Sequence, residues 1–130
     1  MTNLTAQEAF NTVAAHLLSQ GEKSVVVEED GKIFCAYRGS RGRKCAIGVL
    51  IPDEVYKPVF EDYIVSGLIR DYGLFPPELA SLLHRLQGIH DTVDSEFWGS
   101  RLRMLAASQD LDGGVVDECE KVNTGRGRGA

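Results

Sequence analysis

The chain has 130 residues, of which 43% are apolar, and a formal net charge of −5. This length and apolar content fit one domain that buries a core without metal or disulfide cross-links, and the acidic balance argues against a general nucleic-acid binder. No apolar run approaches the roughly 18 residues that a membrane span needs, and the N-terminal residues lack the basic and apolar regions of a signal peptide. The sequence therefore predicts a cytoplasmic protein. Its three cysteines are expected to be thiols, because an odd number without an export signal does not indicate a disulfide framework.

The first predicted elements are a helix and a β-hairpin. Thr5 and Glu8 have the spacing of a capping box, and apolar residues then recur at helical spacing until Gly21. Two short runs, 24–28 and 32–38, flank an Asp-Gly turn signal and predict antiparallel strands. Both faces of the second strand are partly apolar, so the pattern leaves open which face meets the core. An isolated ribbon is marginal in water, so this one is expected to pack on helices or to gain another strand.

A basic segment follows the hairpin. It puts four positive charges into seven residues, namely Arg38, Arg41, Arg43 and Lys44. Two glycines within it permit positive φ, so that backbone N–H groups would converge on an anion while guanidinium groups make bidentate contacts. That combination suits a phosphate, although the spacing is not that of a nucleotide P-loop. The alternative is a solvated loop whose arginines balance an acidic protein surface.

The rest of the chain is predicted to be mainly helical. The apolar run 45–51 is either a third strand or a buried helical turn. Three further helices are expected at about 65–72, 78–92 and 95–106. In the second of these, His90 falls inside the apolar arc. A buried histidine needs a partner, so His90 is either a structural residue bonded to a backbone carbonyl or a hydroxyl, or a site residue.

These elements define an α+β fold, in which a mostly helical single domain of about four to five helices carries one β-hairpin or small antiparallel sheet near its N-terminus. The globular domain is expected to cover residues 1–114. Residues 115–130 are predicted to be a flexible tail, with at most one short element before the end GRGRGA.

One chemical possibility is a small cysteine-dependent hydrolase or transferase. Cys45 follows the basic segment, and if it opened a helix both effects would lower its pKa and favour the thiolate. His90 would then be the base, with Asp91 or Gln87 as the orienting group. The alternative is an inert thiol inside a buried apolar run.

A zinc site is a second possibility. The side chains that would form it are those of Cys35, Cys45, His90 and Cys119. Structural zinc sites usually contain a close C-x₂-C pair, and the spacing from Cys35 to Cys45 is too long to be diagnostic. No metal and no cofactor is therefore predicted.

A third possibility is binding without chemistry. The basic segment would hold an anionic group of the ligand, and a tyrosine would stack on a ring of the ligand. Polar side chains of the 78–92 helix would form hydrogen bonds with the edge of that ring. The ligand-binding residues predicted on this basis are Tyr37, Arg38, Arg41, Arg43, Lys44, Tyr56, Gln87 and His90. Such a pocket suits a nucleotide or a cyclic nucleotide, whereas a protein partner with an acidic surface would use the same arginines at an interface.

Three segments carry a resemblance to a known group. They are CAYRG at 35–39, KCAIGVLIPDEVY at 44–56 and QGIHD at 87–91. Together they resemble a group of small uncharacterised proteins of tailed phages and bacterial genomes, over roughly residues 5–110. No activity is established for that group, so the resemblance implies an origin and not a mechanism.

Small phage accessory proteins commonly act by binding a component of the host. The resemblance therefore implies a non-enzymatic binding protein of the host cytoplasm. The more specific expectation is inhibition of a host defence pathway, either by sequestering an anionic nucleotide signal or by masking a host protein. The cysteine hydrolase stays the enzymatic alternative, and a structural or regulatory phage protein is the third. An exposed ribbon edge is also compatible with a homo-oligomer.

Overall fold

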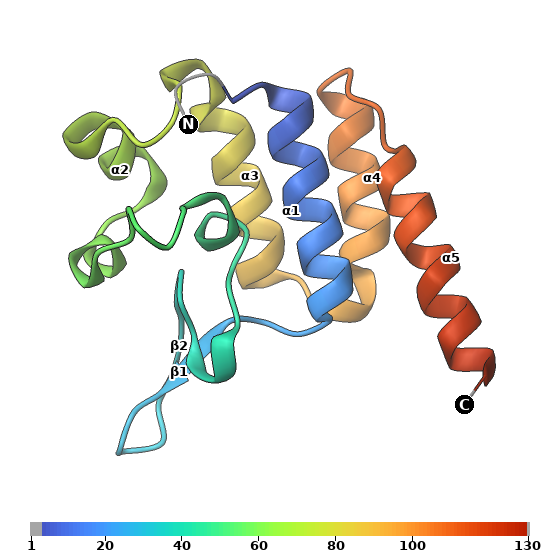
Figure 1. The fold of residues 1–130 in the computed structure, drawn as a ribbon, viewed down its shortest axis with the longest axis horizontal. Helices are drawn as coiled ribbons and strands as arrows, with labels where there is room; N and C mark the ends of the chain where they lie inside the picture. The colour runs from blue at the N-terminus through green and yellow to red at the C-terminus, as the bar shows by residue number, and fades with distance from the viewer. Residues whose placement is uncertain (1–3, 130) are drawn as a thin grey trace.

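The computed structural model describes the backbone of residues 4–129 and the side chains of residues 4–121. It is a mostly helical α+β domain with one two-stranded antiparallel sheet, as the sequence predicts (Figure 1). The helices are α1 (Ala6–Gln20), α2 (Val65–Tyr72), α3 (Ala80–Thr92), α4 (Trp98–Ser108) and α5 (Gly114–Gly129), and the strands are β1 (Val25–Val27) and β2 (Ile33–Cys35). Within the described residues, no helix combines the length and the apolar character needed to cross a bilayer.

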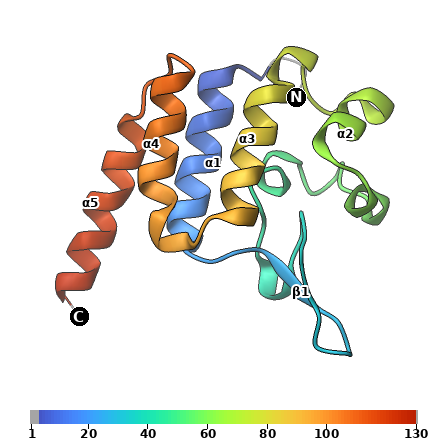
Figure 2. The same cartoon turned by 180° about the vertical axis from the view of Figure 1, so that it is seen from behind.

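Helix α1 is the centre of the helical layer. It lies between α3 and α4 in Figures 1 and 2, and α5 packs against both α1 and α4. The capping box at its start is confirmed, because the Thr5 hydroxyl accepts from the Glu8 backbone N–H at 3.1 Å and the Glu8 carboxylate accepts from the Thr5 N–H at 3.1 Å. Gly21 ends the helix in the left-handed region, at φ 71°. Between these signals five apolar residues are fully buried and form the middle of the core, namely Ala9, Phe10, Val13, Ala14 and Leu17, while Leu18 is partly buried at the edge.

The packed part of the chain extends past residue 114, the predicted end of the globular domain, into the segment for which one short element was allowed. Helix α5 packs against α1 and α4, and its Val116 side chain is fully buried. On its outer side, Arg103 of α4 forms ion pairs with Asp117 at 2.9 Å and with Glu120 at 2.6 Å. The packed domain therefore continues through the first turns of α5, and the segment that follows residue 114 is not a flexible tail at these positions.

The run 45–51 forms a buried helical turn and not a third strand. After an isolated bridge between Arg38 and Lys44, the chain makes a 3₁₀ turn, η2 (Gly48–Leu50), that packs against α1. A side chain at Gly48 would not fit, because its Cβ would lie 1.9 Å from the carbonyl oxygen of Tyr37. This close approach fixes the foot of the hairpin to the helical layer.

The hairpin projects from the helical body (Figures 1 and 2). Its register pairs Val25 with Cys35 and Val27 with Ile33. The foot is anchored, since Ser24 and Tyr37 are buried. The outer part does not join the core formed by the described residues, and its four large apolar side chains are 36–64% exposed, namely Val26, Val27, Ile33 and Phe34. Neither face of the outer ribbon therefore meets the core.

Candidate functional site

The basic segment is tied to its own domain at both ends. At the start, the Arg38 guanidinium contacts the Asp53 carboxylate and the Ile51 carbonyl, and it lies 4.7 Å from the centre of the Tyr56 ring. Lys44 lies 3.5 Å from the same Asp53 carboxylate. The hydrogen bond from Arg38 and the charge of Lys44 hold the pKa of Asp53 below its ordinary value. These two cations therefore already have an anionic partner.

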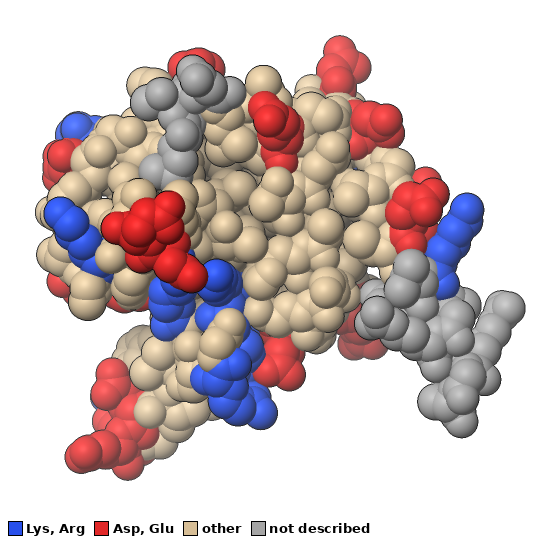
Figure 3. Space-filling model, viewed as in Figure 1, with Lys and Arg blue, Asp and Glu red and all other residues tan. Residues whose placement is uncertain are grey.

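The middle of the segment is bound to Glu22 and to β1. Arg43 donates to Glu22 at 3.1 Å and to the Val25 carbonyl at 3.3 Å, and its side chain is largely buried. Arg41 lies 3.2 Å from Glu22, but its side chain is 74% exposed. Figure 3 shows the resulting basic cluster at the foot of the hairpin. The arginines mainly fasten the segment to its surroundings and do not converge on an open concavity.

Glu61 is a site residue that the sequence pattern did not reveal. Its carboxylate accepts from the backbone N–H groups of Tyr37 and Arg38 at 2.9 and 3.1 Å, and from the Tyr56 hydroxyl at 2.6 Å. Burial and the hydrogen bond to Glu61 raise the pKa of Tyr56 to about 12. One carboxylate thus joins the end of the hairpin to a segment more than 20 residues away, and local spacing gives no signal of such a contact.

Cys45 does not have the environment of a reactive thiol. Its side chain is fully buried, and its sulfur accepts from the Gly48 backbone N–H at 3.3 Å. Burial raises the pKa of Cys45 to about 12 and outweighs the hydrogen bonds that favour the thiolate. The prediction of a lowered pKa is therefore wrong, and the thiol stays protonated at neutral pH.

His90 is a buried structural histidine. Its Nε2 accepts the Ser24 backbone N–H at 2.8 Å, so the ring proton lies on Nδ1, which donates to the Asp91 carboxylate at 2.7 Å. The ring also stacks on Trp98, with 5.7 Å between the ring centres. The partners are a backbone N–H and a carboxylate, where the sequence suggested a carbonyl or a hydroxyl. Because both ring nitrogens are engaged, neither is available as a general base.

Gln87 has a connecting role. Its amide donates to Asp91 at 2.8 Å, and its carbonyl oxygen accepts from the Ile47 backbone N–H at 3.1 Å. It therefore links α3 to the buried run that contains Cys45. Of the predicted catalytic residues, Gln87 and His90 both contact Asp91, and Gln87 also contacts Cys45, but no direct contact joins Cys45 to His90 among the described residues.

Three side chains at the end of β2 are grouped as metal ligands would be. Donor atoms of Cys35, His90 and Asp91 lie within 4.8 Å of one another. Ligation by His90 would break either its bond to the buried Ser24 N–H or its bond to Asp91, which leaves two ready donors where structural zinc sites use four. Burial and the charge of Asp91 also raise the pKa of Cys35. Of the four predicted zinc ligands, only Cys35 and His90 belong to this cluster.

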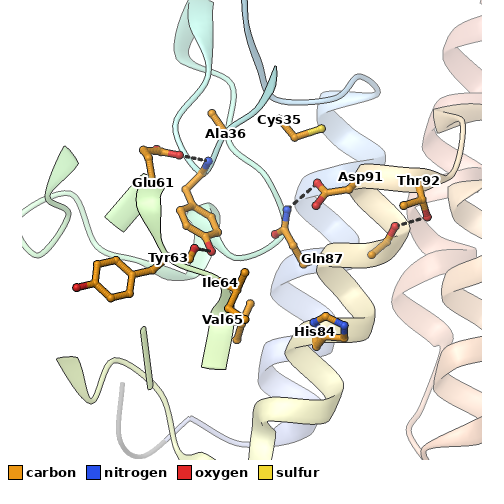
Figure 4. Close-up of a pocket in the computed structure, with 12 residues that line it drawn as sticks. Cys35, Ala36, Glu61, Tyr63, Ile64, Val65, His84, Gln87, Asp91 and Thr92 are labelled. Atoms are coloured by element: carbon orange, nitrogen blue, oxygen red, sulfur yellow. Dashed lines mark hydrogen bonds between the residues drawn. The ribbon is translucent and has the colours of Figure 1, made fainter. Parts of the chain in front are cut away.

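A pocket of about 400 Å³ lies between the end of β2, the segment 61–65 and α3 (Figure 4). Its polar lining includes Cys35, Tyr37, Glu61, Tyr63, Gln87 and Asp91. Two of these side chains are carboxylic acids, and none of the lining residues is Lys or Arg. Of the predicted ligand-binding residues, only Tyr37 and Gln87 line this pocket. An anionic ligand would meet carboxylates there, and the cations that were predicted to hold it are paired elsewhere.

The outer hairpin is the other candidate site. We define the hairpin surface as the side chains of Val26, Val27, Ile33 and Phe34, which are exposed together on a projecting ribbon. The register places Val26 beside Phe34 on one face of the ribbon and Val27 beside Ile33 on the other, so each face carries one exposed apolar pair. Exposed apolar side chains that gather on a projecting element indicate an interaction site. The sequence predicted both strands and two partly apolar faces on the second strand, but one of these faces was expected to be covered by the core.

Comparisons of the chain with protein families, with curated proteins and with solved structures find no match. The resemblance to the phage group therefore stays a prediction.

Proposed function

We propose that this chain is a non-enzymatic binding protein that holds a protein partner against the hairpin surface. The observation that carries the proposal is the exposure, by 36–64%, of four large apolar side chains on one projecting ribbon. Full burial of one such side chain is worth about 1.5–3 kcal/mol, so covering the exposed part of the two on one face is worth roughly 1.5–3 kcal/mol before the costs of association. A partner surface would supply that burial.

The surroundings of the other candidate residues favour a binding role over catalysis. Cys45 is a buried, protonated thiol, and both nitrogens of His90 are occupied. Two groups that must exchange protons with a substrate cannot do so while they hold the core together.

The charges favour a protein over a nucleotide as the partner. Arg38 and Lys44 contact Asp53, and Arg43 and the more exposed Arg41 contact Glu22, so that all four predicted phosphate ligands have a carboxylate partner within the domain. The pocket beside them presents carboxylates. Masking of a host protein by a phage inhibitor, in the host cytoplasm, is the more specific form of this proposal, and it rests on the sequence resemblance alone.

Site-specific photocrosslinking tests the proposal. Phe34 on the hairpin surface is 51% exposed, and Phe97, between α3 and α4, is 52% exposed, so the two positions form a matched pair. We would replace each in turn by p-benzoylphenylalanine and irradiate cells in which the gene is naturally expressed. A distinct adduct with another protein is expected from position 34 and not from position 97. Equal adducts from both positions, or none from position 34, would contradict the proposal.

A further inference from the structure

We infer that the open edge of β2 pairs with β2 of a second copy of this chain, giving a four-stranded antiparallel sheet across a two-fold axis at Phe34. This inference goes beyond the proposed function. Pairing at the edge would leave the faces of the joined sheet, which carry the hairpin surface twice, available to a different protein.

The backbone of β2 is open on its outer side. The Ala36 N–H donates to the Ser24 carbonyl at 3.0 Å, and the Glu28 N–H donates to the Lys32 carbonyl at 2.8 Å. Hydrogen-bonded and non-hydrogen-bonded pairs alternate along an antiparallel ribbon, so the backbone groups of Ile33 point away from β1. Those of Cys35 do the same. Neither residue finds a backbone hydrogen-bond partner on that side among the described residues.

The edge of β1 is better covered than that of β2. The Val25 carbonyl already accepts from Arg43. The chain at Gly39 also passes so close that a Cβ there would lie 2.7 Å from the Val25 nitrogen. A strand that adds to this ribbon therefore has β2 as its accessible edge. A two-stranded ribbon that projects into solvent gains most from such an addition, because two strands alone are marginal in water.

A two-fold axis at Phe34 uses the whole of β2. Each Ile33 then faces Cys35 of the other copy in a hydrogen-bonded pair, and the two Phe34 residues face each other as a non-hydrogen-bonded pair about 4.5 Å apart at Cα. Cross-strand aromatic pairs of this kind favour sheet formation. The register joins the two outward-facing residues of each strand without leaving one unpaired.

The distribution of charge along the hairpin favours the antiparallel arrangement. The tip carries Glu28, Glu29 and Asp30, of which Asp30 pairs with Lys32, so the tip remains acidic. The foot carries the basic segment, with Arg41 its most exposed cation. In Figure 3 the acidic tip and the basic foot lie at opposite ends of the ribbon. Antiparallel pairing places each acidic tip beside the basic foot of the other copy, whereas parallel pairing would bring the two acidic tips together.

Disulfide trapping tests the register. In a background with Cys35→Ser and Cys119→Ser, Phe34→Cys is expected to form a disulfide-linked dimer on mild oxidation, because a Cα separation near 4.5 Å suits a disulfide. Val27→Cys, on β1 and equally exposed to oxidant, is the matched control and is expected to stay mostly monomeric. Similar dimer yields from the two variants would overturn the register. Circular dichroism confirms that both variants are folded.

Sedimentation of the unmodified chain over a range of concentrations tests the dimer itself. We expect reversible dimerisation that Phe34→Lys abolishes. Glu29→Lys or Arg41→Glu alone should weaken it about 2- to 5-fold, and the two together should restore it. A protein that stays monomeric at high micromolar concentration overturns this inference. That outcome would leave the proposed function standing, because an adduct with a different protein at position 34 does not require a second copy.

Discussion

Replacing His90 by alanine should destabilise the domain more than any other substitution of a polar side chain on α3. The Ser24 backbone N–H is buried and has the His90 ring as its acceptor, so its loss leaves an unsatisfied donor at a cost of about 1–3 kcal/mol. The vacated ring volume beside Trp98 adds about 1–2 kcal/mol. The total of roughly 2–5 kcal/mol corresponds to a fall in Tm of roughly 10 to 20 °C.

Urea denaturation followed by circular dichroism measures this loss, with an unchanged slope of free energy against urea as the sign that only stability has changed. His84→Ala, at an exposed position two turns earlier on the same helix, is the control and should cost no more than about 0.5 kcal/mol. If His90→Ala unfolds at the same urea concentration as the unmodified protein, the structural role assigned to this histidine is refuted.

Three further predictions concern the buried thiol, a close backbone contact and the first helix cap. A thiol reagent at pH 8 should label Cys35 and leave Cys45 unlabelled in the native protein, and peptide mapping that finds Cys45 modified without unfolding would contradict its raised pKa of about 12. Gly48→Ala should cost roughly 2–4 kcal/mol in a denaturation experiment, because its Cβ would overlap a carbonyl oxygen. Gly88→Ala, where a Cβ meets nothing within 4 Å, should be neutral or stabilising. The capping hydrogen bonds lower the pKa of Glu8 in the folded state, so their stabilisation is present at neutral pH and should disappear as the pH falls through that lowered pKa. A Thr5→Ala variant whose stability has the same acid dependence as the unmodified protein would argue against this origin.

The helices were largely predictable because their signals are local. The capping box at Thr5, the apolar periodicity of α1 and the glycine at 73 that ends α2 act within one or two helical turns. Helix α5 was missed for the opposite reason. Its composition is polar and rich in glycine, and it is held by the burial of Val116 and by ion pairs with Arg103, contacts that no local pattern encodes.

The site was less predictable than the fold. The basic segment was evident in the sequence, but its partners were not. Arg43 pairs with Glu22, which precedes the hairpin, and Arg38 pairs with Asp53, which follows the buried turn. Whether a cluster of arginines faces a ligand or a carboxylate of its own chain depends on these long-range contacts. The same holds for Cys45, whose pKa is set by burial and not by the nearby positive charges in the sequence.

Binding by the hairpin surface is the central claim, and the affinity for a purified partner tests it most directly. With the protein identified by crosslinking at position 34, the dissociation constant would be measured for the unmodified chain, for Phe34→Glu and for the matched Phe97→Glu. A central apolar anchor is worth about 2 kcal/mol or more, so Phe34→Glu should weaken binding roughly 30-fold or more, and Phe97→Glu less than about 2-fold. Equal effects of the two substitutions, or no effect of Phe34→Glu, would place the binding surface elsewhere on the domain.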